Sequence, residues 1–106
     1  MTEDEAIDAI VTTLYEPGTI IMKLRDNQGL DRAELEHIRT AILFLIDVYR
    51  TRHVIPKRLS LAFVDIRTLM LSAHALYDEA EQDEIEDAVE ELVEFAYRLF
   101  GADTET

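Results

Sequence analysis

The sequence predicts an all-α fold, an antiparallel helical bundle of four main helices plus one short helical segment. Apolar residues recur at three- and four-residue spacing through four long segments, as expected for helices with a buried face. Residues that favour helix N-caps precede three of these segments, each with a glutamate three positions later. Prolines and glycines separate the segments. We expect one helical-bundle domain over residues 1–100 and a disordered tail over residues 101–106.

The first helix begins near Thr2, because Thr2 and Glu5 fit a capping box, and Pro17-Gly18 ends it. Its apolar face comprises Ile7, Ile10, Val11 and Leu14. The next segment, residues 19–28, opens with the β-branched run Thr-Ile-Ile, which also suits an extended chain. No other segment reads as a strand to pair with it, so we predict a short helix that ends near Gly29.

The third and fourth helices are the most apolar. Asp31 fits the N-cap of the third helix, with Glu34 three residues later. Its first stripe comprises Leu35, Ile38, Ile42, Leu45 and Tyr49, and its second comprises Ala41, Phe44 and Val48. Pro56 marks the start of the fourth helix, which we expect to run to about Asp78. Its stripes comprise Leu59, Phe63, Ile66, Met70, Ala73 and Leu76 on one face and Leu61, Val64, Leu71 and Ala75 on the other.

A short link joins these two helices, so we expect them to form an antiparallel hairpin. Each helix has two apolar stripes, and the hairpin covers only one of them. The first and last helices would cover the other stripe within one chain, or a second copy of the chain would. A symmetric homodimer is the commonest such assembly. The sequence leaves both arrangements open.

The last helix has an apolar seam and an acidic face. Asp83 and Glu86 fit a capping box, which places the helix start at Asp83. The seam comprises Ile85, Val89, Leu92, Ala96 and Leu99, and Gly101 is the expected stop. Arg98 is the only basic residue of this helix, although exposed helices usually mix charges because like charges four residues apart repel. The acidic face comprises Asp83, Glu86, Asp87, Glu90, Glu91 and Glu94.

This acidic face predicts a docking surface for a protein with a basic surface, because complementary fields speed association and select the partner. Immunity proteins, antitoxins and secretion chaperones use such surfaces. Charged residues opposite an apolar seam are also typical of any solvated helix. The acid excess further suits adaptation to a salt-rich cytoplasm. Partner binding and simple solvation therefore both stay open.

The net charge of −13 is distributed unevenly. Residues 1–16 contain five acidic residues and no basic residue, and residues 17–67 contain nine basic and six acidic residues. Residues 68–106 contain one basic and twelve acidic residues. This balance argues against nucleic acid, which requires clustered Lys and Arg, and against anionic membranes. A basic protein, or the basic middle segment of a second copy, is the expected partner.

The chain has no cysteine, which excludes disulfides and thiolate chemistry. Its first residues are acidic where a secretory signal is basic. The longest unbroken apolar run, Ala41–Ile46, is too short to span a bilayer. We therefore expect a cytoplasmic protein that does not bind membranes. With three glycines and no Gly-rich phosphate loop, the sequence predicts no cofactor.

Glu34-x-x-His37 offers a metal-binding alternative. Residues three positions apart project from one side of a helix, and a Glu-x-x-His pattern on each of two helices helps to hold two metal ions in ferritin-like bundles. This chain has one copy of the pattern. A dimer would supply a second copy, but the bridging carboxylates are not identifiable.

Arg67 and His74 offer an enzymatic alternative, because seven residues make two turns of a continuous helix and so share a face. Histidine acts as general acid or base on a ribose hydroxyl, and arginine stabilises phosphate charge. The run Arg67-Thr68-Leu69-Met70-Leu71-Ser72-Ala73-His74 resembles the Arg-x(4–6)-His motif of HEPN-domain ribonucleases, which are all-α and usually dimeric. It departs from that family at Thr68, where Asn, Asp or His is usual. The resemblance implies a ribonuclease dimer with Arg67 and His74 as catalytic residues.

We predict a non-enzymatic, small acidic interaction module that binds a basic protein or a second copy of itself. The predicted partner-binding residues are those of the acidic face of the last helix. The alternatives are the HEPN-like ribonuclease dimer and a structural homodimer whose acidic surface is adapted to salt. Salt adaptation predicts that thermal stability rises steeply with salt while neutralising the last helix leaves partner binding unchanged.

Overall fold

The computed structural model describes residues 1–16 and 18–101, and this part of the chain contains helices and no strands. The elements are α1 (Glu3–Tyr15), α2 (Ile20–Arg25), α3 (Arg32–Val48), α4 (Lys57–Leu71), the single-turn 3-10 helix η1 (His74–Leu76) and α5 (Glu79–Phe100). The predicted all-α bundle of four main helices and one short helix is confirmed. Of the predicted tail, Gly101 caps α5, and residues 102–106 lie outside the described part.

The helix starts show which local signals the chain uses. Thr2 and Glu5 form the predicted capping box on α1. Asp31 caps α3 by accepting a hydrogen bond from the Glu34 backbone N–H, 3.0 Å away. The short helix predicted within residues 19–28 is confirmed as α2, although it begins without a side-chain cap on its own N-cap residue.

Two predicted boundaries in the second half of the chain are wrong. Helix α4 ends at Leu71 rather than near Asp78, and the 3-10 turn η1 follows it. Helix α5 begins at Glu79 rather than Asp83, because Asp78 caps it and accepts from the Glu81 backbone N–H at 2.9 Å. Asp-x-x-Glu occurs three times in succession in this acidic stretch, at Asp78, Asp83 and Asp87, and the first occurrence starts the helix.

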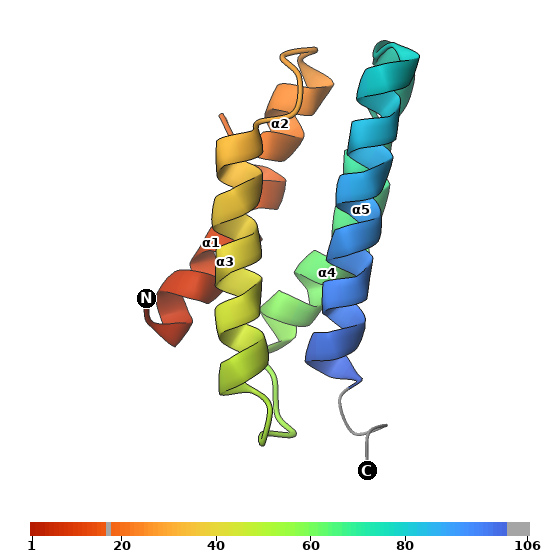
Figure 1. Cartoon of the computed structure of the whole chain (residues 1–106). Coiled ribbons are helices and arrows are strands. Elements are labelled where there is room, and N and C mark those ends of the chain that lie inside the picture. The colour runs from red at the N-terminus through yellow and green to blue at the C-terminus, as the bar shows by residue number, and fades with distance from the viewer. Residues whose placement is uncertain (17, 102–106) are drawn as a thin grey trace.

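The predicted hairpin of α3 with α4 is also wrong. Helix α1 packs on both α3 and α4, and α5 packs on both as well, so α3 and α4 lie at opposite corners of the bundle. Figure 1 shows α3 and α5 running in the same direction in one layer, with α1 and α4 behind them. The link over residues 49–56 reaches at most about 26 Å when extended, against a bundle diagonal of about 14 Å. It therefore crosses the bundle without strain.

The second apolar stripes of α3 and α4 are covered to different extents in this arrangement. The second stripe of α3 is buried at Ala41 and half-buried at Phe44 and Val48. In contrast, Leu61 and Val64 on the second stripe of α4 remain 56% and 71% exposed. Helices α1 and α5 thus cover α3 within one chain but leave the outward side of α4 open.

Candidate functional site

Helix α5 exposes acidic residues on three different sides, rather than on the single face that the sequence predicted. The core-facing side is the confirmed seam, with Ile85, Val89, Leu92 and Leu99 buried and Ala96 half-buried. Because α5 packs between α3 and α4, the acidic residues divide into one set beside α3, one set beside α4 and one set facing solvent.

The acidic residues beside α3 are neutralised by arginines of α3. Arg32 forms an ion pair with Glu84, and Arg39 Nε lies 2.7 Å from Glu91 Oε1. A hydrogen bond to Glu36 and the charge of Glu91 raise the pKa of the Arg39 guanidinium. Glu91 therefore belongs to a helix–helix contact within the chain, and it is only half-exposed.

The basic middle segment makes similar contacts with α1. Arg52 Nη1 lies 3.1 Å from Glu3 Oε1, and Arg58 Nη1 lies 2.9 Å from Asp8 Oδ1. Together with the pairs on α3, these contacts show that arginines of the middle segment hold the acidic first and last helices of the same chain. The contrast in charge between the segments is therefore used, at least in part, for ion pairs within the chain.

The acidic residues that face solvent have no such partners. We call Asp83, Asp87 and Glu94 the acidic ridge. All three side chains are exposed. Within the described residues, no Lys, Arg or His forms an ion pair with any of them. The ridge is the part of the predicted acidic face that remains available to another molecule.

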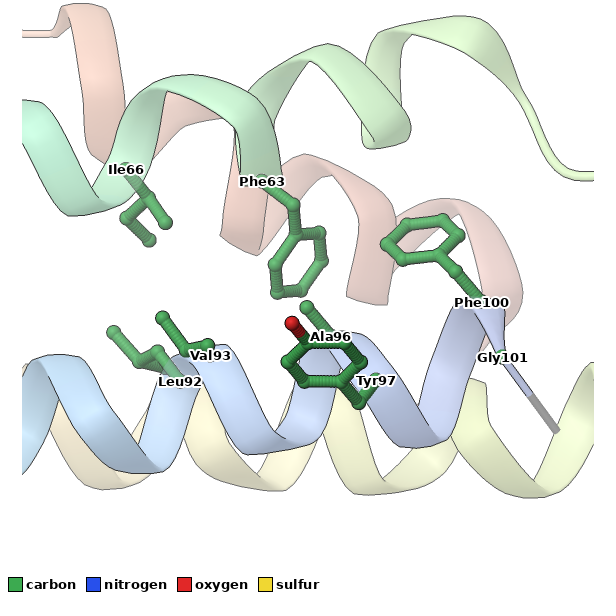
Figure 2. A pocket seen from close by; sticks show the side chains of 8 residues that line it. All are labelled: Phe63, Ile66, Leu92, Val93, Ala96, Tyr97, Phe100 and Gly101. Atoms are coloured by element: carbon green, nitrogen blue, oxygen red, sulfur yellow. The ribbon is translucent and has the colours of Figure 1, made fainter. Parts of the chain in front are cut away.

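Beside α4, an apolar groove of about 370 Å³ separates α4 from α5. Figure 2 shows the aromatic rings of Phe63, Tyr97 and Phe100 gathered at one end, with Ile66 and Val93 facing each other at the other. The rings of Phe63 and Phe100 meet edge to face with their centroids 5.4 Å apart. The sequence predicts Phe63 on the core stripe of the fourth helix, whereas Tyr97 and Phe100 belong to none of the predicted apolar stripes. Val93, Tyr97 and Phe100 are four and three residues apart, and this helical spacing could have indicated a second apolar side of the last helix.

At its other end the groove continues between charged walls. Arg67 and Leu71 of α4 line it together with Glu86 and Glu90 of α5. His74 Nε2 lies 3.5 Å from Glu86 Oε2. Glu86 and Glu90 therefore belong to the rim of this groove.

The two predicted catalytic candidates, Arg67 and His74, belong to different elements. Arg67 is an exposed residue of α4, whereas His74 begins η1 after α4 has ended at Leu71. The continuous helix that would place them on one face is therefore absent from this stretch of the described chain. His74 lies beside the Glu86 carboxylate, and Arg67 lines the same groove as Glu86. A carboxylate at this position would repel a phosphate.

The two predicted metal ligands, Glu34 and His37, have different environments. Glu34 Oε1 accepts a hydrogen bond of 2.9 Å from the backbone N–H of Ile20, the first residue of α2. Glu34 thus caps a helix fourteen residues earlier in the chain, while His37 is exposed. The described residues contain no cluster of three or more side chains suited to a metal ion.

By length and composition, Lys57–Leu76 is apolar enough to cross a bilayer, with a mean hydropathy of 1.3. The unbroken-run criterion of the sequence analysis did not find this stretch. Only 28% of its most apolar window is buried within the molecule, which reflects the uncovered side of α4. In the structure the stretch is divided by the end of α4 at Leu71. No protein-family model, curated protein sequence or solved structure matches the chain.

Proposed function

We propose that this protein is an acidic interaction module that binds a basic protein partner through the acidic ridge of α5. The observation that carries the proposal is the uneven pairing of the α5 carboxylates. Arginines form ion pairs with Glu84 and Glu91 beside α3, whereas Asp83, Asp87 and Glu94 are exposed and form no ion pair with a basic side chain among the described residues. Like charges at this spacing weaken an isolated helix, and a basic partner would remove that cost.

The backbone that carries the ridge is well held, which also favours docking. It lies on the longest helix of the molecule, 22 residues, which is held on both sides by packing against α3 and α4. A rigid row of charges loses little conformational entropy on binding, which favours both fast association and selectivity.

The test compares two triple variants with the same net charge. The ridge variant carries Asp83→Asn, Asp87→Asn and Glu94→Gln. The control variant carries Asp4→Asn, Glu16→Gln and Asp26→Asn, which remove three exposed carboxylates from α1, α2 and their connections. Each tagged variant is used to capture proteins from the native host, and each stoichiometric partner is identified and its affinity is measured.

We expect the ridge variant to bind the captured partner at least about tenfold more weakly than the control variant, because close complementary charges contribute more than distant ones. Equal weakening by the two variants would mean that net charge alone drives the binding. Unchanged binding by both variants would remove the ridge from the interaction. Either result contradicts the proposal.

The ribonuclease alternative stays a prediction, since nothing in the geometry favours it. Purified protein that degrades RNA, and that loses this activity with Arg67→Ala or His74→Ala, would support the ribonuclease and overturn the interaction module as the primary function. The salt-adaptation alternative is distinguished by its effect on stability, because it predicts that the free energy of unfolding rises steeply with salt while partner binding is unchanged.

A further inference from the structure

A second groove, of about 410 Å³, lies between α3 and α5 beside the acidic ridge. We call it the α3/α5 groove. The two helices run in the same direction in one layer (Figure 1). Each lines the groove with four residues at positions i, i+3, i+4 and i+7, which is one face of a helix. These residues are Arg32, Leu35, Glu36 and Arg39 of α3, and Glu84, Asp87, Ala88 and Glu91 of α5.

Two ion pairs cross this groove. Arg32 pairs with Glu84, and Arg39 pairs with Glu91. In both pairs the residue of α5 comes 52 positions after the residue of α3, so the pairs share one register. They are two helical turns apart, which is about 11 Å along the helices. The ion pairs therefore link the two walls at both ends of a middle stretch.

The middle stretch has carboxylates on both walls and no basic residue between them. Glu36 of α3 and Asp87 of α5 are both exposed and line the groove. No basic side chain of the described residues forms an ion pair with Asp87. The lining of the whole groove contains four carboxylates and two guanidinium groups, an excess of two negative charges. The middle stretch therefore suits one further cation.

The floor of the middle stretch is apolar. Ala88 is buried, with 6% exposure, and Leu35 is half-buried. A long basic side chain combines an apolar stem of methylene groups with a charged head, so it matches a groove with an apolar floor and acidic walls. A metal ion would gain nothing from that floor. The described residues also contain no cluster of three or more side chains suited to a metal ion.

Arg39 shows how a guanidinium is held in this groove. Its Nη1 donates a hydrogen bond of 2.8 Å to Glu36 Oε2, and its Nε lies 2.7 Å from Glu91 Oε1. One guanidinium thus bridges a carboxylate of each wall. The planar guanidinium has five donors in a fixed fork, whereas the ammonium of lysine is a compact point charge. The separation of the two walls therefore favours arginine over lysine.

We propose that the α3/α5 groove receives one arginine side chain of the basic protein partner. The stem of that arginine lies on Leu35 and Ala88, and its guanidinium lies between Glu36 and Asp87. Asp87 belongs both to the groove and to the acidic ridge, so the ridge speeds the encounter and the groove fixes the orientation of the partner. This inference rests on the proposed function for the existence of the partner. It adds that the basic surface of the partner presents an exposed arginine.

The first test needs no partner. N-acetyl-L-arginine amide and N-acetyl-L-lysine amide carry the same single positive charge. Each is added stepwise to the isotope-labelled native protein while NMR records the backbone amide shifts. For the arginine probe we expect saturating shifts at Leu35, Asp87 and Ala88, with a dissociation constant on the order of 1–10 mM, as for a ligand of this size. The lysine probe should bind at least about threefold more weakly.

Glu36→Gln and Glu94→Gln are matched variants, since each removes one exposed carboxylate by the same substitution. Glu36 lines the groove but is not part of the ridge, whereas Glu94 is part of the ridge but does not line the groove. Glu36→Gln should weaken binding of the arginine probe at least about fivefold, because a charged hydrogen bond is lost. Glu94→Gln should weaken it less than about twofold. Helicity measured by circular dichroism should be the same for both.

Arg39→Gln tests the role of the arginine that already occupies part of the groove. It leaves Glu36 and Glu91 available to the arginine probe, which should then bind at least about threefold more tightly. The matched control is Arg50→Gln, which makes the same change in charge at an ion pair with Asp47 outside the groove. The control should keep the affinity within about twofold of the native value.

The proposal would be overturned if the groove residues showed no saturating shifts, or if Glu36→Gln and Glu94→Gln had equal effects. Equal binding of the two probes would identify a site for any cation and would overturn the choice of arginine. Failure of the proposed function is a separate outcome, because the ridge variant is measured with the captured partner. That partner should also bind Glu36→Gln at least about fivefold more weakly than native protein. A partner that is sensitive to the ridge variant but not to Glu36→Gln would keep the ridge and overturn the groove.

Discussion

At the scale of single residues, Tyr49 shows how the start of the chain is held against α3. Its hydroxyl donates a hydrogen bond to Glu3 Oε2, and its ring is buried while the carboxylate of Glu3 also accepts from Arg52. Burial, together with the hydrogen bond to Glu3, raises the pKa of Tyr49 to about 12 from its ordinary 10.0. The hydrogen bonds from Tyr49 and Arg52 lower the pKa of Glu3 below its ordinary 4.5. The start of α1 is thus tied to the end of α3.

These opposite shifts predict the pH dependence of folding. Tyr49 favours its neutral form in the folded state, so its contribution is complete below about pH 10 and is lost as the pH rises through about 12. Glu3 favours its ionised form, so its contribution is present above about pH 4.5 and is lost as the pH falls through its lowered pKa. Urea unfolding across pH should show both losses in the native protein. Tyr49→Phe should abolish the alkaline loss and reduce the acidic one, in which Arg52 also takes part. Tyr97→Phe, at an exposed site, should leave both unchanged.

Glu34 gives a second test at this scale, because its carboxylate accepts a hydrogen bond from the first backbone N–H of α2. Glu34→Ala should lower the free energy of unfolding by about 1 kcal/mol, as loss of a helix cap does. Glu34→Gln keeps an acceptor oxygen and should lose less than half of that. The measurement is urea unfolding with and without added divalent metal or chelator. A metal-dependent stability that disappears with Glu34→Gln would revive the metal site and contradict the cap.

Local patterns predicted caps well where one signal stood alone and poorly where several followed one another. Thr2 and Asp31 each stand before a single helix, and both predicted caps are present. The stretch from Asp78 to Glu86 contains two successive Asp-x-x-Glu patterns, and the capping box at Asp83 predicted the helix start five residues after the true cap, Asp78. The role of Glu34 was not predictable, since its partner, the Ile20 backbone N–H, lies fourteen residues away.

At the scale of helices, α5 is an amphipathic helix with unequal polar sides. Its apolar seam was predictable from spacing alone, because 3.6-residue periodicity fixes which residues face the core. Which acids would be paired was not predictable, because that depends on α3 standing beside α5. The arginines of α3 form ion pairs with Glu84 and Glu91. The three carboxylates of the ridge form none among the described residues.

Repulsion along the ridge predicts a stability effect that is independent of any partner. Asp83 with Asp87 and Glu90 with Glu94 are like-charged pairs four residues apart. The ridge variant, Asp83→Asn with Asp87→Asn and Glu94→Gln, should therefore raise the free energy of unfolding by on the order of 0.5 kcal/mol at low salt. The gain should shrink in about 1 M salt, where charges are screened over roughly 3 Å.

Urea unfolding of the native protein, the ridge variant and the charge-matched control at both salt levels provides the measurement. The control should gain less, because its three carboxylates are dispersed over other elements. If the native protein gains stability steeply with salt while the ridge variant still binds its partner with native affinity, salt adaptation explains the acidity and the docking role fails.

At the scale of the whole molecule, helix pairing was the part that sequence reasoning misjudged. The apolar stripes indicated the correct set of helices and most of the buried faces, but Leu61, Val64 and Leu76 of the predicted fourth helix are exposed. They did not determine which helices stand side by side, because a helix with two apolar faces can sit at any corner of a bundle. A link of eight residues, 49–56, permits a diagonal crossing as readily as a hairpin. The α1/α3 and α4/α5 pairs leave the outward face of α4 open.

The most direct test of the proposed docking role compares how the partner captured from the native host binds the ridge variant and the charge-matched control. Both variants lose three carboxylates, so a difference between them reports the position of the charges and not the net charge. We predict at least about tenfold weaker binding by the ridge variant than by the control. Equal affinity of the two variants would contradict the account.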